Sequence, residues 1–233
     1  MSTPQFPTAA VDRPVSAARG FVADVFGWMF VGLGITAGLA AFFSSQNNMK
    51  QYVSDHPGVL IAVVIAQLGL VIALVAGMRK MSASTARLVF CLYAATMGFT
   101  FALIFETYST ASIASTFVVT AGMFGAAAAF GWVTKKDLTM VGQVAIFLLI
   151  GLILTMLVNF FIGSSTLEYA ISAIGVIIFT ALTAYDLQKI KQVAAQATGD
   201  GEAERKAAIF GALALYLDFI NLFLFLLRFT GGR

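Results

Sequence analysis

Seven apolar segments of similar length divide the chain, and short polar stretches separate them. An apolar run of about 20 residues is long enough to cross a bilayer as an α-helix. We therefore predict an all-α membrane protein of about seven transmembrane helices. The predicted spans are residues 23–44, 58–78, 86–106, 112–133, 141–163, 168–188 and 207–228.

The same pattern predicts one polytopic transmembrane domain over residues 21–233, preceded by a tail. Residues 1–20 contain Pro4, Pro7 and Pro14 among small and polar residues, so we expect this segment to be flexible. The longest internal polar stretch, roughly residues 192–206, is also expected to be mobile.

Composition supports this class of protein. The 233 residues are 60% hydrophobic and only 11% charged, and a soluble domain with this composition would expose a large apolar surface. The net charge is +3, but in a membrane protein basic residues mark the cytoplasmic loops. We therefore expect the lipid bilayer, and no nucleic acid, as a partner.

Basic residues gather on one side of the predicted bundle. With the N-terminus in the cytoplasm, that side receives most of them, and the other side receives Lys50, Arg228 and Arg233. The cytoplasmic set is Arg13, Arg19, Arg79, Lys80, Arg87, Lys135, Lys136, Lys189, Lys191, Arg205 and Lys206. The positive-inside rule then favours a cytoplasmic N-terminus and an external C-terminus. Arg228 and Arg233 leave open a re-entrant last segment, with both termini inside.

Two aspartates interrupt the last two apolar segments. Asp186 lies in TAYDLQKIK and Asp218 lies in ALYLDFINLFLFLLR. An ionised carboxylate at mid-membrane costs about 2.5–3.5 kcal/mol on insertion scales, so such residues usually face a bundle interior or a water-filled cavity. If the two meet, repulsion and desolvation act together and the pair can share a proton, which is a physical basis for a pH sensor.

The distances from flanking lysines place the two aspartates at different depths in the membrane. Asp186 is three residues before Lys189, whereas Asp218 is twelve residues after Lys206. For the two to touch, the last helix must begin outside the bilayer, or the sixth must sit deep with its lysines snorkelling. The alternative is two separate aspartates, one at the interface and one hydrogen-bonded in the core.

Three polar neighbours are candidates to support such a pair. Asn221 shares a helical face with Asp218, Tyr216 flanks Asp218, and Tyr185 precedes Asp186. Arg79 ends the second span and could reach a carboxylate, although a basic interface anchor is the alternative.

Common catalytic and cofactor motifs are absent from the sequence. It contains no GxxxxGK[ST], HExxH or CxxC, and its single cysteine, Cys91, is interpreted as a packing residue. We predict no enzyme activity, no catalytic residues and no bound cofactor. Since calcium usually takes six to eight oxygens, Asp186 and Asp218 alone predict only a weak, transient contact with a permeating calcium ion.

Several motifs together resemble the transmembrane Bax inhibitor motif family, most closely its bacterial inner-membrane members. They are GFTFALIFETYSTASIASTFVVTAGMFG, TKKDL, IFTALTAYDLQKIK and GALALYLDFINLFLFLLR. The resemblance covers nearly the whole chain after about residue 20. It implies six helices around a central seventh, with Asp186 and Asp218 as a pH-sensing pair.

The resemblance also implies a pH-dependent calcium leak through the membrane. An arginine at the end of the second helix acts as a latch in some members of the family, and Arg79 matches that position approximately. An acidic residue earlier on that helix in some members has no counterpart here, where the chain reads Gln67-Leu68. Some bacterial relatives interact with a membrane-bound protease, and eukaryotic relatives suppress cell death.

The sequence leads to three functional hypotheses. The first is a pH-sensitive leak channel for calcium or another cation, gated by Asp186 and Asp218. The second is a membrane interaction protein that modulates a protease or a stress response without transport. The third, an intramembrane aspartyl hydrolase, lacks a GxGD setting around Asp218.

Overall fold

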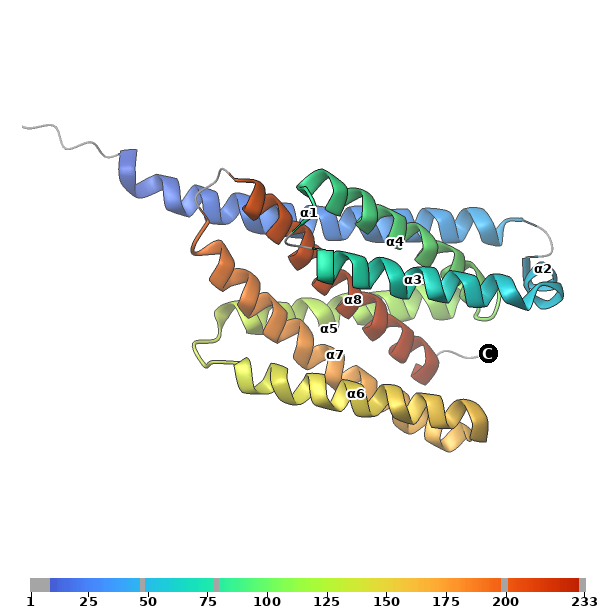
Figure 1. Ribbon diagram of the computed structural model, residues 1–233. Coiled ribbons are helices and arrows are strands. Elements are labelled where there is room, and N and C mark those ends of the chain that lie inside the picture. The colour runs from blue at the N-terminus through green and yellow to red at the C-terminus, as the bar shows by residue number, and fades with distance from the viewer. Residues whose placement is uncertain (1–8, 47–48, 78–79, 198–200, 231–233) are drawn as a thin grey trace, which may run out of the picture.

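The computed structural model describes residues 9–46, 49–77, 80–197 and 201–230. These residues form eight helices and no strand (Figure 1). The helices are α1 (Ala9–Ser44), α2 (Met49–Asp55), α3 (Pro57–Gly77), α4 (Ala83–Phe105), α5 (Thr110–Val133), α6 (Thr139–Ile162), α7 (Ser165–Ala194) and α8 (Glu202–Thr230). All except the short α2 are long and apolar enough to cross a membrane, as the sequence predicted.

The C-terminal helix α8 lies at the centre of the bundle. It packs against α7, α1, α5 and α4, and it is the most buried of the seven long helices. α3 packs mainly on α4 and α6 mainly on α7, so these two helices form the outer layer. The predicted arrangement of six helices around a central last helix is confirmed.

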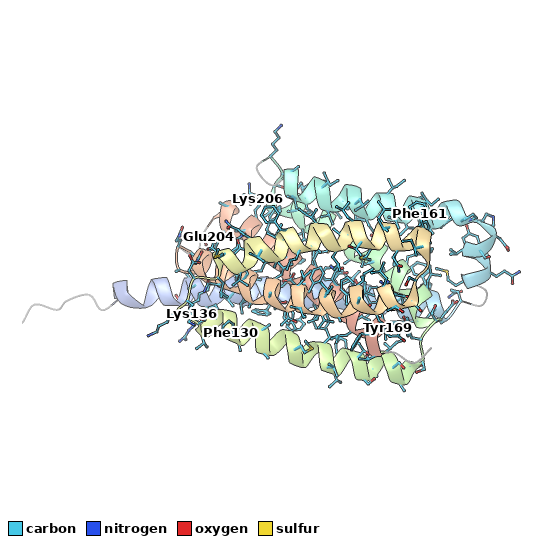
Figure 2. The ribbon with its side chains drawn as sticks, turned by 90° about the horizontal axis from the view of Figure 1, so that it is seen from below. Phe130, Lys136, Phe161, Tyr169, Glu204 and Lys206 are labelled. Atoms are coloured by element: carbon cyan, nitrogen blue, oxygen red, sulfur yellow. The ribbon has the colours of Figure 1, made fainter. Side chains whose placement is uncertain are left out.

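The two ends of the bundle differ in charge. The α5–α6 connection and the start of α8 lie at the same end as α1's first turns, and Figure 2 shows Lys136 and Glu204 there. Phe161 and Tyr169 lie at the opposite end, close to the end of α8 (Figures 1 and 2). We call the first end, which carries Arg19, Lys135, Lys136, Lys189 and Lys191, the basic end.

The last helix is continuous and crosses the whole bundle, as a full membrane span would. It starts at the basic end and runs to the opposite end (Figure 1). There Arg228 Nε lies 3.5 Å from Glu168 Oε1 at the start of α7. This ion pair gives the last-turn arginine a partner at the less basic end.

Two local predictions need correction, and one short helix was not predicted. α1 begins at Ala9, inside the predicted tail, and includes Pro14; four alanines within residues 9–20 favour helix there. Residues 1–8 lie outside the described ranges. The polar stretch at 192–206 is shorter than predicted, since α7 continues to Ala194 and α8 begins at Glu202. Glu202 and Glu204 place negative charge at the start of α8, and Lys191 places positive charge at the end of α7. Both arrangements stabilise the helix ends through the helix dipole. The seven-residue α2 was not predicted, because it is too short for a periodic pattern.

Candidate functional site

Close contacts between α7 and α8 fix the relative position of the two aspartates. Gly175 faces the ring of Phe225, and Gly211 faces the side chain of Ile190. Between these two contacts the antiparallel helices bring Thr183 level with Asp218. Asp186 lies one turn after Thr183 on the same face of α7, about 4.5 Å nearer the basic end.

Asp218 is buried in the helix contact, with only 4% of its surface exposed. Its carboxyl group is hydrogen-bonded to Thr183 and interacts electrostatically with Asp186. The Thr183 hydroxyl also lies 2.8 Å from the carbonyl oxygen of Phe179. Asp218 Oδ2 is buried and has no hydrogen-bond partner among the described residues. The site therefore contains a carboxylate oxygen that the surrounding helices do not satisfy.

Asp186 is half-buried and faces a more polar environment than Asp218 does. Lys189, one turn further along α7 and exposed, interacts with it electrostatically. Asp218 is therefore the buried member of the pair, and Asp186 is the half-buried member nearer the basic end. The structure brings together the two aspartates that the sequence singled out.

Helix length explains how the depths of the two aspartates match. α8 has 29 residues and is about 44 Å long, whereas the hydrocarbon core of a bilayer is about 30 Å thick. Asp218 follows the start of α8 by sixteen residues, or about 24 Å, and Asp186 precedes the end of α7 by eight residues, or about 12 Å. Both helices are longer than the core, so α8 is long enough to begin outside the bilayer, as the pairing requires.

The predicted supporting residues point in other directions. Tyr216 is fully buried, and its hydroxyl lies 2.6 Å from Thr36 Oγ1 on α1. The Asn221 amide donates to Leu217 O of its own helix at 2.8 Å. The Tyr185 ring packs over Gly142 on α6, and Lys189 Nζ lies 5.3 Å from the ring centroid. The role of Asn221 and Tyr185 as polar support for the pair stays a prediction, and the Tyr216 hydroxyl is engaged with α1.

Two residues that matter for the geometry were not predicted from the sequence. Thr183 bonds Asp218, and its position three residues before Asp186 was an available signal. Gln188 is buried and joins α7 to the α5–α6 connection: its Oε1 accepts from Leu138 N at 2.8 Å, and its Nε2 donates to Lys136 O at 2.9 Å. No local signal identifies these partners, which lie fifty or more residues away.

Arg79, the candidate latch, lies outside the described residues, so its role stays a prediction. Within the described ranges no group of three or more His, Cys, Asp or Glu side chains could hold a metal ion. Asp186 and Asp218 therefore provide two carboxylates, fewer ligands than a tightly bound calcium ion requires.

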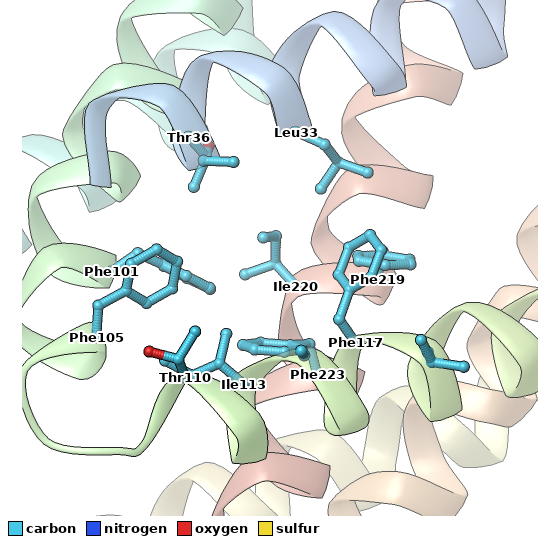
Figure 3. A pocket seen from close by; sticks show the side chains of 13 residues that line it. Leu33, Thr36, Phe101, Phe105, Thr110, Ile113, Phe117, Phe219, Ile220 and Phe223 are labelled. Carbon is cyan, nitrogen blue, oxygen red and sulfur yellow. The ribbon is translucent and has the colours of Figure 1, made fainter. Parts of the chain in front are cut away.

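The cavity in Figure 3 is lined by neither Asp186 nor Asp218, and its lining is mainly apolar. It has a volume of about 360 Å³, lies between α1 and α5, and has Phe219, Ile220 and Phe223 of α8 along its floor. Its lining is apolar apart from Thr36 and Thr110, and no ionisable side chain lines it. A cation would find no carboxylate there, so we do not assign it to an ion path.

The fold and the site define a polytopic helical membrane protein with paired aspartates on its last two helices. Residues 18–233 match the family model described as Inhibitor of apoptosis-promoting Bax1. The match covers almost the whole chain, and the chain belongs to this Bax inhibitor family.

Individual relatives are similar to the chain over nearly its full length. The inner membrane protein YbhL of Escherichia coli K12 is 46% identical over 231 residues, which cover 98% of this chain and 99% of YbhL. An uncharacterised protein of Borreliella burgdorferi is 43% identical over 91% of this chain and 92% of its own. An uncharacterised protein of Deinococcus radiodurans is 41% identical over 95% of this chain and 94% of its own length.

Proposed function

We propose that the protein is a non-enzymatic, pH-sensitive leak channel for cations, with calcium as the leading candidate. In this proposal the Asp186–Asp218 pair is its sensor and gate. The observation that carries the proposal is the juxtaposition of the two carboxyl groups between α7 and α8, with one Asp218 oxygen buried and unsatisfied. Such a pair changes its hydrogen bonding when it gains or loses a proton.

The physical step is a change in the contact between two central helices. When Asp218 carries a proton, it can donate to Thr183, whose own hydroxyl can donate to Phe179 O. When both aspartates are ionised, their repulsion acts directly across the α7–α8 contact. Because α8 packs against four other helices, a change in this contact alters the centre of the bundle. A permeating cation would meet the two carboxylates only transiently.

The test is calcium flux into liposomes that contain the purified protein, from about pH 5 to pH 8. We expect a pH-dependent flux in the wild type and a flux with little pH dependence in Asp218→Asn. Asp24→Asn is the matched control, because Asp24 is exposed on α1 and lies outside the pair. An unchanged pH profile in Asp218→Asn contradicts the proposal. Arg79→Gln in the same assay tests the latch, which predicts a shift of the pH midpoint.

We further propose that the protein resides in the bacterial inner membrane with its N-terminus in the cytoplasm. The name of the Escherichia coli relative supports the membrane, and the gathering of lysines and arginines at the basic end supports the orientation. Reporter fusions at each terminus test the orientation. A cytoplasmic signal from the C-terminal fusion would contradict it.

A second candidate function is a membrane interaction protein that modulates a membrane protease or a stress response. In this candidate function the lipid-facing side of the outer helix α6, where Phe147 and Phe160 are exposed, would form the contact with the partner. This candidate predicts no flux at any pH and a stable co-purifying membrane partner. The liposome assay therefore separates the two functions.

A further inference from the structure

A second cavity lies at the basic end, on the side of α1 that faces α5 and α7. It has a volume of about 630 Å³. Arg19, Val22 and Phe26 of α1 form one wall, and Trp132 at the end of α5 and Ala195 just after α7 form the other. We call it the basic crevice. It contains neither aspartate of the pair, so ligand binding there is independent of the proposed function.

The basic crevice combines a cationic rim with an apolar interior. Arg19 is exposed and forms no ion pair with the described residues. Lys191 Nζ donates to the carbonyl oxygen of Trp132 and lies 5.7 Å from the centroid of its indole ring. Arg19 is the charged residue in the lining, and Lys191 contacts Trp132 of the opposite wall from outside the lining, while Val22 and Phe26 line the interior. Basic pockets between transmembrane helices with this character suit anionic lipid head groups.

The depth of the basic crevice matches one leaflet of a bilayer. The candidate span of α1, Ser16–Ser44, has 29 residues and is longer than the hydrocarbon core, and Arg19 lies at its basic end. Phe26 is seven residues further along α1, about 10 Å deeper, and half of the hydrocarbon core is about 15 Å thick. A head group at Arg19 therefore places acyl chains against Val22 and Phe26. Trp132 lies where aromatic residues meet the membrane interface.

The cavity of Figure 3 is not part of the same binding site. It begins at Leu33, fourteen residues or about 21 Å beyond Arg19 along α1. That distance exceeds the depth of one leaflet, and no basic residue lines the cavity. It has no feature that would select one lipid over another.

We propose that the basic crevice binds an anionic phospholipid of the leaflet on the basic side. The phosphate would lie at Arg19 and near Lys191, and the acyl chains would pack on Val22, Phe26 and the Trp132 ring. A zwitterionic lipid presents the same chains but a weaker net attraction to the two cations. The site thus selects by head-group charge.

The experiment is native mass spectrometry of the full chain in detergent, titrated with phosphatidylglycerol or with phosphatidylcholine of the same acyl chains. We expect phosphatidylglycerol to bind more tightly than phosphatidylcholine. Arg19→Gln should weaken phosphatidylglycerol binding about fivefold, which corresponds to about 1 kcal/mol per basic side chain at an anionic surface. Phosphatidylcholine binding should stay unchanged in the same variant.

Lys80→Gln is the matched control, because Lys80 is an exposed lysine at the same end and does not line the basic crevice. It should leave binding of both lipids unchanged. Equal binding of the two lipids to the wild type overturns the proposal, as does an equal loss in Arg19→Gln and Lys80→Gln. The proposal is also overturned if Arg19→Gln leaves the lipid adducts intact and instead removes a signal from a protein dimer, because Arg19 would then act in a protein contact. Arg19 is exposed, so melting temperatures close to the wild type are expected for both variants.

Discussion

Gly131 on α5 packs directly against the backbone of Ala184 on α7. A Cβ atom at position 131 would lie 2.1 Å from the carbonyl oxygen of Ala184, far closer than a van der Waals contact. This contact places α5 directly against α7 at Ala184, two residues before Asp186. The glycine therefore fixes the position of the helix that carries one half of the aspartate pair.

Gly131→Ala should destabilise the protein by about 1–3 kcal/mol, because the methyl group forces α5 away from α7. Thermal or denaturant unfolding in detergent measures the change. Gly125→Ala is the control on the same helix, since nothing lies within 4 Å of a Cβ at that position. It should be neutral or slightly stabilising. Equal stability of Gly131→Ala and Gly125→Ala would contradict the close α5–α7 contact.

Gln188→Ala should loosen the α5–α6 connection. The substitution leaves Leu138 N and Lys136 O without their present partner, and each unsatisfied buried group costs about 1–3 kcal/mol. Hydrogen exchange should report faster exchange at residues 136–138. The exposed Gln192→Ala is the control and should leave exchange unchanged. Unaltered protection in Gln188→Ala would show that the glutamine does not anchor this connection.

Asp137 should contribute an acid-dependent part of the stability. It accepts hydrogen bonds from Thr139 N at 2.9 Å and Thr139 Oγ1 at 2.6 Å, and these bonds lower the pKa of its carboxyl group. A lowered pKa means that the contribution is complete above the ordinary value near 3.9 and is lost as the pH falls through the folded value.

Asp137→Ala should therefore be less stable than the wild type at pH 7 and converge with it well below pH 4. Melting temperatures measured from about pH 2 to pH 7 test this expectation. Asp55→Ala, at an exposed aspartate on α2, serves as the control. A constant difference between wild type and Asp137→Ala across the whole range would exclude a titrating contribution.

Tyr216→Phe should cost about 0.6 kcal/mol, a typical value for a hydrogen bond between transmembrane helices. The lost bond joins the Tyr216 hydroxyl to Thr36, which still donates to Ala94 O at 2.9 Å. The pH profile of cation flux should not change, because the Tyr216 hydroxyl is directed to α1 and not to the aspartate pair. Exposed Tyr169→Phe is the control for stability. A shifted pH profile in Tyr216→Phe would make the tyrosine part of the sensor.

The sequence contained enough information for the spans and for the two aspartates. Long apolar segments predict crossing helices whatever their packing, and a carboxylate within such a segment is conspicuous at Asp218. Helix ends were harder, because Lys189, Lys191 and Gln192 interrupt the apolar pattern before α7 ends at Ala194.

Side-chain direction could not be predicted in the same way. Tyr216 is two residues from Asp218, yet it contacts Phe90 and Tyr93 of α4 and bonds Thr36 of α1. The alignment of Thr183 with Asp218 depends on contacts such as Gly175 with Phe225, which are far apart in the chain. Such register is a property of the packed helices and leaves no local trace in the sequence.

The most direct test of the central claim is a double-mutant cycle on the pH dependence of calcium flux in liposomes. The cycle compares the wild type with Asp186→Asn, Asp218→Asn and the double variant. If the two carboxyl groups act as one pair, each single variant removes most of the pH dependence and the double variant adds little more. Independent, additive effects of the two substitutions, or a wild-type pH profile in Asp218→Asn, would contradict the account.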